Sequence, residues 1–276
     1  MNHFKCQGWP VFVLFIDASK AFDRLCHSDL FLILLEREMC PVYLRILLSM
    51  YKCQRAKVRW DRTYSDEFLM SNGVRQGGIL SPLLFTIYID NIFKKLKTTG
   101  MGCYIDDVFA GSFGYADDLV LIAPSLAGLK CMIKICEDYA EQYNILYNPK
   151  KSKLLHYNVA HDKEISIELC GTKVQIVDSE VYLGNFIASD LSDRNITSNM
   201  GDFYRRSNQL RADFYMLPSH IQYKLFTCYF INLCGCNLWN YNKMYVQKIY
   251  TAWRIVIRKL YKLPYTAHNY IVNGLN

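Results

Sequence analysis

Apolar segments that end at aspartates constrain this chain most strongly. Residues 11–16 (VFVLFI) form a continuous β-branched and aromatic run that stops at Asp17, a pattern typical of a strand buried on both faces. Asp17 is therefore expected at the carboxyl end of that strand. Asp117 and Asp118 follow a short aromatic segment and precede the apolar run 119–122, which predicts a strand-turn-strand hairpin with both carboxylates at its tip.

The three aspartates together indicate a metal site. Adjacent carboxylates repel each other, and near a core they raise each other's pKa unless a cation neutralises them. Mg²⁺ favours carboxylate oxygens and retains waters and substrate phosphates. Two such ions, roughly 3.5 to 4 Å apart, activate an attacking hydroxyl and stabilise the leaving oxygen of a phosphoryl transfer. The pattern therefore predicts two-metal phosphoryl transfer.

Composition limits the class of protein. The 276 residues are 51% hydrophobic, enough for one large core or two modest domains. A formal charge of +7 favours a polyanionic partner. The 11 cysteines show neither disulfide nor zinc-ligand spacing, so reduced thiols in the nucleus or cytoplasm are expected. The N-terminus lacks a signal-peptide layout and no apolar stretch spans a bilayer, so neither secretion nor a membrane partner is expected.

Periodicity and capping residues predict the remaining elements. From residue 192 onward the pattern is helical, with one apolar face flanked by basic residues in its last part. Strands and helices followed by a helical tail predict an α+β fold with a helical appendage. Helices are expected with Ser28 or Asp29, Ser81 and Ser125 as their N-terminal caps, the second of them starting at Pro82. Strands are expected as a pair within 55–70 and at 104–110, 113–123, 153–157, 165–169, 174–177 and 181–183.

Four segments match ordered motifs of reverse transcriptases. Residues 15–23 (FIDASKAFD) look like the first catalytic motif, residues 72–85 (NGVRQGGILSPLLF) like the second, and residues 115–118 (YADD) like the catalytic box. Residues 182–184 (YLG) resemble the later primer-grip turn. Over residues 11–184 the chain thus resembles the reverse transcriptases of LINE-type (non-LTR) retrotransposons, and the helical remainder resembles them more weakly.

The resemblance implies an architecture. We expect a polymerase palm, an antiparallel sheet backed by helices, with partial fingers and a C-terminal helical thumb-like region. Only ten residues precede the first strand, fewer than the fingers of the family contain there, so an N-terminally truncated copy is expected. The expected divisions are residues 1–28, palm with the first motif; 29–71, partial fingers; 72–187, palm with the second motif, YADD hairpin, lysine motif and primer grip; and 188–276, the thumb-like region.

The resemblance also implies residue roles. Asp17 and Asp117 would bind two Mg²⁺ ions, or Mn²⁺ as an alternative, with Asp118 nearby and the Ala18 carbonyl as a backbone ligand. Phe22 stands where the family places a bulky gate against a ribose 2′-hydroxyl, although ordinary core packing is the alternative role for this aromatic residue.

Further roles concern the nucleotide and the primer. Gln76 and Gly77 would line the nucleotide and template pocket, where glycine permits close backbone approach. Arg75 would contact a phosphate or pair with an acid. Residues 148–153 (NPKKSK) look like the lysine-bearing motif that protonates the leaving pyrophosphate. Lys151 is our choice of donor, with its neighbours as competitors and a plain surface lysine run as the alternative. The primer grip would comprise Tyr182, Leu183 and Gly184.

A second aromatic-x-Asp-Asp segment competes with the YADD box. Residues 104–107 (YIDD) contain Asp106 and Asp107, but glycine follows almost at once, whereas residues 119–123 supply a full returning strand. The family also commonly has a non-catalytic Gly-Cys-Tyr-Ile segment at this place. We therefore assign the catalytic turn to Asp117 and Asp118.

The predicted function is RNA-directed DNA polymerisation onto a primer 3′-hydroxyl. Its partners would be an RNA template, a DNA primer and deoxynucleotide triphosphates. Two other hypotheses remain open at this point. One is an inactive truncated fragment that at most binds nucleic acid through its basic surface. The other is a different two-metal phosphoryl-transfer enzyme that has no use for Phe22 and Gln76.

Overall fold

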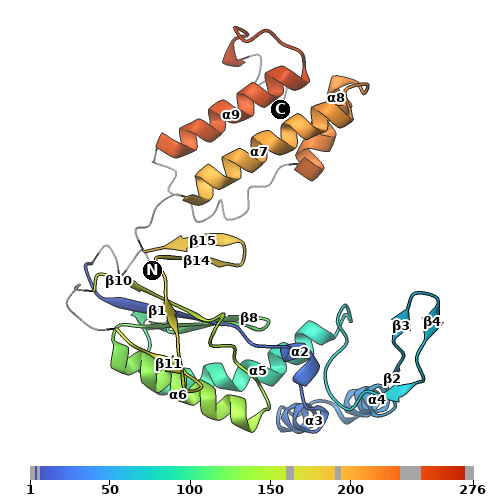
Figure 1. Cartoon of the computed structure of the whole chain (residues 1–276), viewed down its shortest axis with the longest axis vertical. Coiled ribbons are helices and arrows are strands. Elements are labelled where there is room, and N and C mark those ends of the chain that lie inside the picture. Colours follow the sequence, from blue (N-terminus) through green and yellow to red (C-terminus); the bar gives the residue numbers. More distant parts are fainter. Residues whose placement is uncertain (1–3, 5–6, 160–164, 190–193, 231–243, 271–276) are drawn as a thin grey trace. The chain divides into compact units, whose positions relative to one another are not determined.

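A computed structural model describes residues 4, 7–159, 165–189, 194–230 and 244–270. Its internal contacts divide the chain into two units, Met1–Asp178 and Ser179–Asn276, which are treated separately below (Figure 1). The subdomain divisions drawn from the sequence remain predictions. Among the described helices, none is both long and apolar enough to cross a membrane.

A five-stranded sheet with the order β13-β10-β1-β9-β8 forms the centre of the first unit. Strand β1 (Val11–Ile16) lies in the middle, and all its residues are buried, as the continuous apolar run predicts. It pairs antiparallel with β9 (Asp118–Ala123) and with β10 (Lys153–Tyr157). Strand β8 (Ser112–Tyr115) continues the sheet beside β9, and β13 (Gln175–Ile176) lies parallel to β10.

Two helices cover one face of this sheet, as Figure 1 shows for α5 (Ser81–Thr98) and α6 (Leu126–Gln142). The predicted cap of α6 is confirmed, because the Ser125 hydroxyl accepts a hydrogen bond from the Gly128 N–H at 3.1 Å. The apolar stripe of α6, which includes Leu129, Met132 and Cys136, packs as core against alternate residues of β1. The fold class expected from the sequence, α+β with an antiparallel sheet backed by helices, is therefore confirmed, with the β10–β13 pair as a parallel exception.

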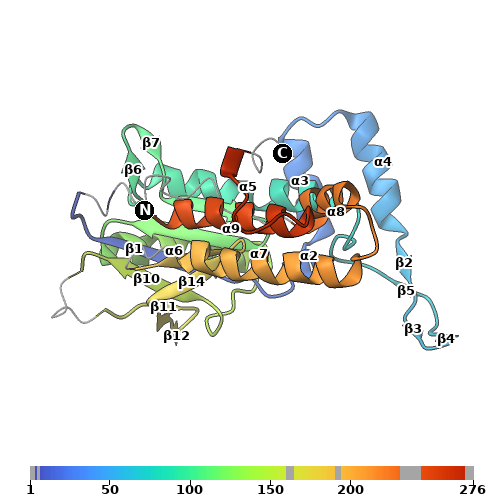
Figure 2. The ribbon, with the colours of Figure 1, turned by 90° about the horizontal axis from the view of Figure 1, so that it is seen from above.

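A second apolar cluster joins α5 to three helices that follow β1. These are α2 (Ala21–Arg24), α3 (His27–Glu36) and α4 (Pro41–Lys52). A narrow ribbon then extends from the end of α4, away from the sheet (Figure 2). It consists of β2 (Arg55–Ala56) paired with β5 (Phe68–Leu69) and β3 (Arg59–Trp60) paired with β4 (Thr63–Tyr64), as expected for residues 55–70.

Two predicted helix starts are wrong by a residue or two. Helix α5 begins at Ser81 itself, and Leu80 is the N-cap residue without a side-chain hydrogen bond. The Ser81 N–H bonds the Gly78 carbonyl at 3.2 Å, so the preceding loop already turns the chain into helical geometry. Helix α3 likewise begins at His27, where the backbone of Cys26 occupies the capping position.

The expected strand over residues 104–110 is wrong, because this segment forms a hairpin. Strands β6 (Tyr104–Ile105) and β7 (Val108–Phe109) pair antiparallel, and Asp106 adopts a φ of 52° at their turn. The rings of Tyr104 and Phe109 meet edge to face at 5.3 Å. Two of the later strands are shorter than expected: Glu168–Leu169 (β11), paired with Thr172–Lys173 (β12), and β13.

The second unit begins with a hairpin and continues as helices. Strands β14 (Ser179–Tyr182) and β15 (Asn185–Ala188) are joined by Leu183 and Gly184, whose φ values of 50° and 75° suit the tight type I′ hairpin turn. The helices are α7 (Arg194–Asp213), α8 (Ser219–Leu225), the π-helical turn η1 (Phe226–Phe230) and α9 (Met244–Leu260).

The helices of the second unit have their own apolar core. Phe203 and Leu210 of α7 pack with Phe226 and with Val256 and Leu260 of α9. The apolar face predicted for α9 is thus confirmed as core packing. Its basic residues, by contrast, remain only partly buried or exposed.

Candidate active site

The YADD segment forms a tight hairpin at one edge of the central sheet. Tyr115 pairs with Asp118 across β8 and β9, so Ala116 and Asp117 make the turn between them. Ala116 adopts a φ of 52°, a left-handed conformation that costs a non-glycine residue energy. Asp117 is half-buried and Asp118 is exposed. The hairpin predicted from the sequence is therefore confirmed.

Strand pairing brings Asp17 to the same edge. Ile16 of β1 lies opposite Leu119 of β9, and one further step along this antiparallel register places Asp17 opposite Asp118. Asp118 is exposed as a whole residue, but partial burial of its carboxyl raises the pKa of that group, and the negative charges of Asp117 and Asp17 raise it further. The three carboxylates thus interact electrostatically at one point of the sheet edge.

A loop after α6 fixes the backbone of Asp17. The Asp17 carbonyl accepts a hydrogen bond from the Asn148 N–H at 2.8 Å, and the Asp17 N–H donates to the Ser152 hydroxyl at 3.2 Å. Ser152 is fully buried and donates in turn to the Asn148 carbonyl at 2.8 Å. Sequence reasoning missed Asn148 and Ser152 as positioning residues. The Asn-Pro pair at residues 148–149 is a turn signal that could have indicated the loop, but not its partner.

Lys151 is the lysine of this loop that approaches one of the three carboxylates. Its ammonium nitrogen lies 3.9 Å from Asp17 Oδ2, and its side chain is 69% exposed. The competing Lys153 instead donates to the Lys150 carbonyl and to the Gln175 side chain. At that distance and exposure the pair with Asp17 contributes little to stability. Lys151 therefore remains available to interact with a substrate.

Phe22 lies on the short helix α2, which follows β1 and Asp17 in the chain. Its ring stacks on Phe85 of α5 with centroids 4.6 Å apart and planes inclined by 23°, and it is only half-buried. The Phe22 carbonyl accepts a hydrogen bond from the Val74 N–H at 2.8 Å. The second motif is thus fastened to the helix that carries Phe22.

Close backbone approach explains Gly73 in the second motif. A Cβ atom at this position would lie 2.8 Å from the Asp23 carbonyl oxygen and 3.0 Å from that of Phe22. The Gly73 carbonyl also contacts His27 Nε2 at 2.7 Å. Only a residue without a side chain permits this contact between the motif and α2.

The rest of the second motif faces outward. Gln76 and Gly77 are exposed, and the Gln76 amide lies 3.5 Å from Asp23 Oδ1. Gly77 has a φ of 80° with open space around it. Arg75 is exposed, and within the described ranges it forms no ion pair with an acidic side chain. The side chains of Arg75 and Gln76 and the backbone of Gly77 are thus accessible to a ligand.

The donor set suits a hard divalent cation. Within the described residues, no three His, Cys, Asp or Glu side chains already form a group that would hold a metal ion, so the carboxylates need side-chain rotation to converge. Their uncompensated charge favours a cation. The Ala18 carbonyl, next to Asp17, accepts no hydrogen bond from any described group. Two carboxylate-bearing strand ends and an unpaired carbonyl oxygen match the ligand preference of Mg²⁺.

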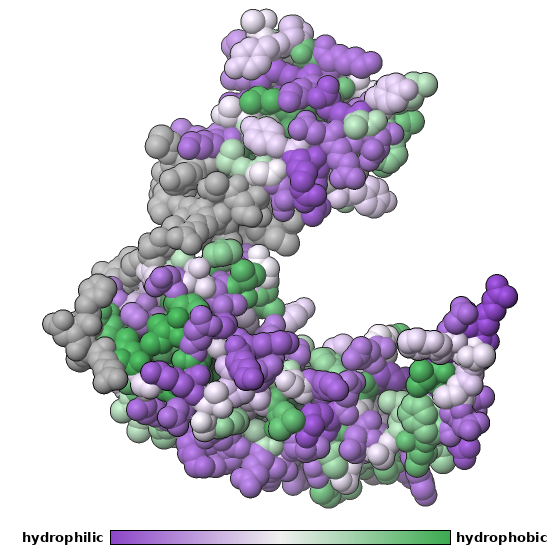
Figure 3. All heavy atoms as spheres, in the orientation of Figure 1, coloured by the Kyte–Doolittle hydropathy of each residue, from purple (hydrophilic) through white to green (hydrophobic). Residues whose placement is uncertain are grey.

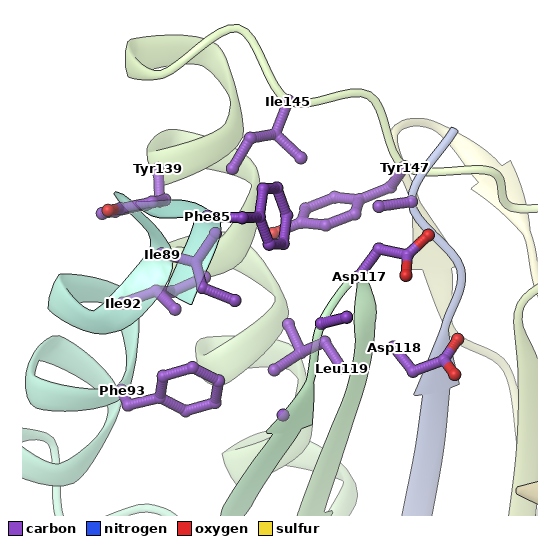
Figure 4. A pocket seen from close by; sticks show the side chains of 13 residues that line it. Phe85, Ile89, Ile92, Phe93, Asp117, Asp118, Leu119, Tyr139, Ile145 and Tyr147 are labelled. Carbon is purple, nitrogen blue, oxygen red and sulfur yellow. The ribbon is translucent and has the colours of Figure 1, made fainter. Parts of the chain in front are cut away.

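A small apolar cavity lies beneath the hairpin (Figure 4). Its lining includes Phe85 and Phe93 of α5 and Tyr147 of the loop that holds Asp17. A Cβ at Gly114 of β8 would lie 2.3 Å from Phe93 Cζ, so the ring packs directly on the strand. Figure 4 shows Asp117 and Asp118 at the rim, with their carboxylate oxygens turned away from the apolar side chains. The cavity forms an apolar floor beneath the hairpin, and apolar surroundings disfavour the charged form of Asp118.

The second Asp-Asp segment occupies a different environment. Asp106 and Asp107 form the turn of the β6–β7 hairpin, a separate two-stranded sheet. Neither strand of that hairpin pairs with β1. Asp17 therefore has Asp118, and not this turn, as its neighbour across the sheet.

The raised pKa of Asp118 generates a prediction about stability. Because its folded-state pKa lies above the unfolded value, the ionised group opposes folding at neutral pH, and the opposition is lost as pH falls through the raised pKa. Asp118→Asn should therefore increase the free energy of unfolding at neutral pH and lose this advantage below about pH 4. Urea titrations at several pH values measure this. High salt should shrink the difference; a variant less stable than wild type at neutral pH would contradict it.

Gly73 and Gly77 form a matched pair for a second prediction. Both have φ values near 80°, but only Gly73 has backbone atoms in the space a methyl group would take. Gly77→Ala should lower the free energy of unfolding by about 1 kcal/mol through backbone strain. Gly73→Ala should lower it by roughly 2 to 4 kcal/mol, because overpacking adds to that strain. Urea unfolding compares them, and equal losses would contradict the contact with α2.

The chain resembles known mobile-element proteins. It is 28% identical over 136 residues to a retrovirus-related Pol polyprotein from the type-2 retrotransposable element R2DM of Drosophila melanogaster, covering 49% of this chain and 13% of that protein. It is 29% identical over 147 residues to the corresponding polyprotein of the type-1 element R2 of Nasonia vitripennis, covering 52% of this chain and 14% of that protein. The chain thus spans a small part of these relatives' length.

A solved structure shares the fold. Telomerase from Candida albicans, in complex with a TWJ fragment of telomeric RNA, superimposes with a TM-score of 0.50 at 14% identity, covering 99% of this chain and 51% of that one. Residues 6–185, more than half of the chain, match the sequence profile of the family described as reverse transcriptase (RNA-dependent DNA polymerase). The chain therefore belongs to the reverse transcriptase family.

Proposed function

We propose that this chain carries the catalytic centre of an RNA-directed DNA polymerase that extends a primer 3′-hydroxyl. One observation carries the proposal: the β1–β9 register sets Asp17 opposite Asp118 with Asp117 at the adjoining turn. Carboxylates on two paired strand ends supply the oxygen ligands that the metal ions of two-metal phosphoryl transfer require. The family to which residues 6–185 belong supports the same reaction.

Asp17 and Asp117 would hold two Mg²⁺ ions, or Mn²⁺ in their place, with Asp118 and the Ala18 carbonyl as further ligands. When bound, such ions supply charge neutralisation and activation of the attacking hydroxyl. The hydrogen bonds of the Asp17 backbone to Asn148 and Ser152 would keep its carboxylate in place during the reaction. Lys151 would donate a proton to the leaving pyrophosphate, a role supported by its 3.9 Å distance from Asp17.

The substrates would be an RNA template, a DNA primer and deoxynucleotide triphosphates. Phe22 is proposed to exclude a ribose 2′-hydroxyl, supported by its half-buried position after the catalytic strand. Gln76, Gly77 and Arg75 would line the nucleotide and template pocket, and Tyr182, Leu183 and Gly184 would grip the primer. A nuclear or cytoplasmic location is consistent with the free cysteines of the described ranges.

Primer extension tests the catalytic assignment. Wild type should incorporate dTTP on poly(rA) with oligo(dT) and Mg²⁺, and Asp117→Asn should reduce the rate by at least about a hundredfold, since several kcal/mol of metal-ion stabilisation are lost. Asp107→Asn, at the turn of the other hairpin, is the matched control and should retain the wild-type rate. Salt-sensitive binding of nucleic acid without aspartate-dependent extension would instead indicate an inactive binding fragment.

The sugar gate has its own test. Phe22→Ala should raise the ratio of kcat/KM for rUTP to kcat/KM for dTTP by roughly tenfold or more. The reason is that an open space next to the sugar removes a steric penalty worth at least ~1.4 kcal/mol. Phe22→Tyr, which keeps the bulk, should retain discrimination. The ratio is insensitive to the fraction of folded enzyme. Unchanged discrimination in Phe22→Ala would point to a two-metal enzyme that does not select a sugar.

A further inference from the structure

A second, larger pocket lies between the end of α4 and the loop of the second motif. Its volume is about 630 Å³, and none of Asp17, Asp117, Asp118 or Phe22 lines it. A volume of this size is typical of small-molecule sites and accommodates a single nucleotide. Six lining residues bear on its chemistry: Met50, Tyr51, Gln54, Arg75, Ile79 and Ser81.

Gln54 is the most informative of these residues. Only 6% of its surface is exposed, and within the described residues its side-chain amide has no hydrogen-bond partner. Its backbone is satisfied, because the N–H donates to the Tyr51 carbonyl and the Gln54 carbonyl accepts from the Met70 N–H at 2.8 Å. A buried amide without a partner costs about 1 to 3 kcal/mol. The fold therefore carries an unmet hydrogen-bonding group on the wall of this pocket.

Two hydroxyl groups accompany the amide. Ser81 is 3% exposed and Tyr51 is 8% exposed, and no described group forms a hydrogen bond with either hydroxyl. Burial raises the pKa of the Tyr51 hydroxyl, while the positive charge of Arg75 acts in the opposite direction, so the guanidinium lies within electrostatic reach. The pocket thus presents an amide, two hydroxyls and one cation.

The remaining walls are apolar and open to solvent. Ile79 is 97% exposed and Met50 is 56% exposed, and Figure 3 shows apolar surface over α4 near the base of the ribbon. None of the lining residues is acidic, and Arg75 is the one charged residue among them. A flat apolar ring with hydrogen-bonding edges, attached to an anionic group, complements such a surface. A nucleotide has this chemistry: amides read base edges, and guanidinium groups bind phosphates.

We propose that this pocket binds one unpaired nucleotide of the template strand, with the Gln54 amide pairing the base edge and Arg75 pairing the phosphate. The inference rests on the proposed polymerase function for the identity of the strand. It adds a base-binding site outside the carboxylate centre. Gln76 and Arg75 are neighbours in the chain, so one loop would contact both the nucleotide site and the template.

Gln54→Met tests the proposal, because it removes the amide and keeps the length of the side chain. The probe is a fluorescent DNA primer annealed to a longer RNA template, with an abasic residue at successive overhang positions, without metal or triphosphates. Wild type should lose affinity roughly tenfold at one position, as one base-amide pair predicts. Gln54→Met should bind the intact template about as weakly as wild type binds the template with the abasic residue at that position. An abasic residue at that position should not weaken binding by Gln54→Met further. Gln142→Met, at an exposed glutamine of α6, should match wild type.

Stability separates recognition from a structural role. Removing an unpaired buried amide should leave the free energy of unfolding of Gln54→Met equal to or above that of wild type. Gln54→Leu serves as a second apolar variant. Unchanged position dependence in both variants, no position dependence in wild type, or displacement of the template by free AMP alone would each overturn the proposal. Because the assay contains no metal, base-dependent binding without primer extension would support this pocket while contradicting the proposed polymerase activity.

Discussion

The antiparallel pairing of β1 with β9 is the interaction on which the site depends. Both strands are buried runs of apolar residues, and a shift of one residue would turn every side chain to the other face. The register is therefore strongly fixed: with Ile16 opposite Leu119, Asp17 must lie opposite Asp118. Hydrophobic burial is non-directional, but the backbone hydrogen bonds between the strands fix which residues lie opposite each other. Together they place the carboxylates at one edge of the sheet.

That arrangement carries an electrostatic cost. Three carboxylates share a sheet edge above an apolar floor that includes Phe85 and Phe93, and the raised pKa of Asp118 records both effects. The surrounding structure keeps the charges in place in two ways. Phe93 packs on Gly114 beneath the hairpin, and the buried Ser152 hydroxyl holds the backbone of Asp17. A cation bound at this edge would offset the repulsion between the carboxylates.

How far the sequence predicts this structure depends on the range of the interactions. The β1 strand, the YADD hairpin and the core stripe of α6 follow from local patterns, and all are confirmed. The YIDD segment was expected to be a strand, because its residue types suit one and the ring contact of Tyr104 with Phe109 is invisible in a linear pattern. The unpaired amide of Gln54 also escapes sequence reasoning, since an exposed and a buried glutamine look alike until α4 and the second motif are placed side by side.

The second motif connects these features through its backbone. Gly73 seats the motif against α2, which carries Phe22. A few residues later, the Gly78 N–H bonds the Arg75 carbonyl at 3.0 Å and the Ser81 N–H bonds the Gly78 carbonyl. This tight loop leads directly into α5, whose Phe85 stacks on Phe22. A shift of the loop caused by a base beside Gln54 would therefore move the wall next to Phe22, so the proposed template pocket and sugar gate are parts of one packed body.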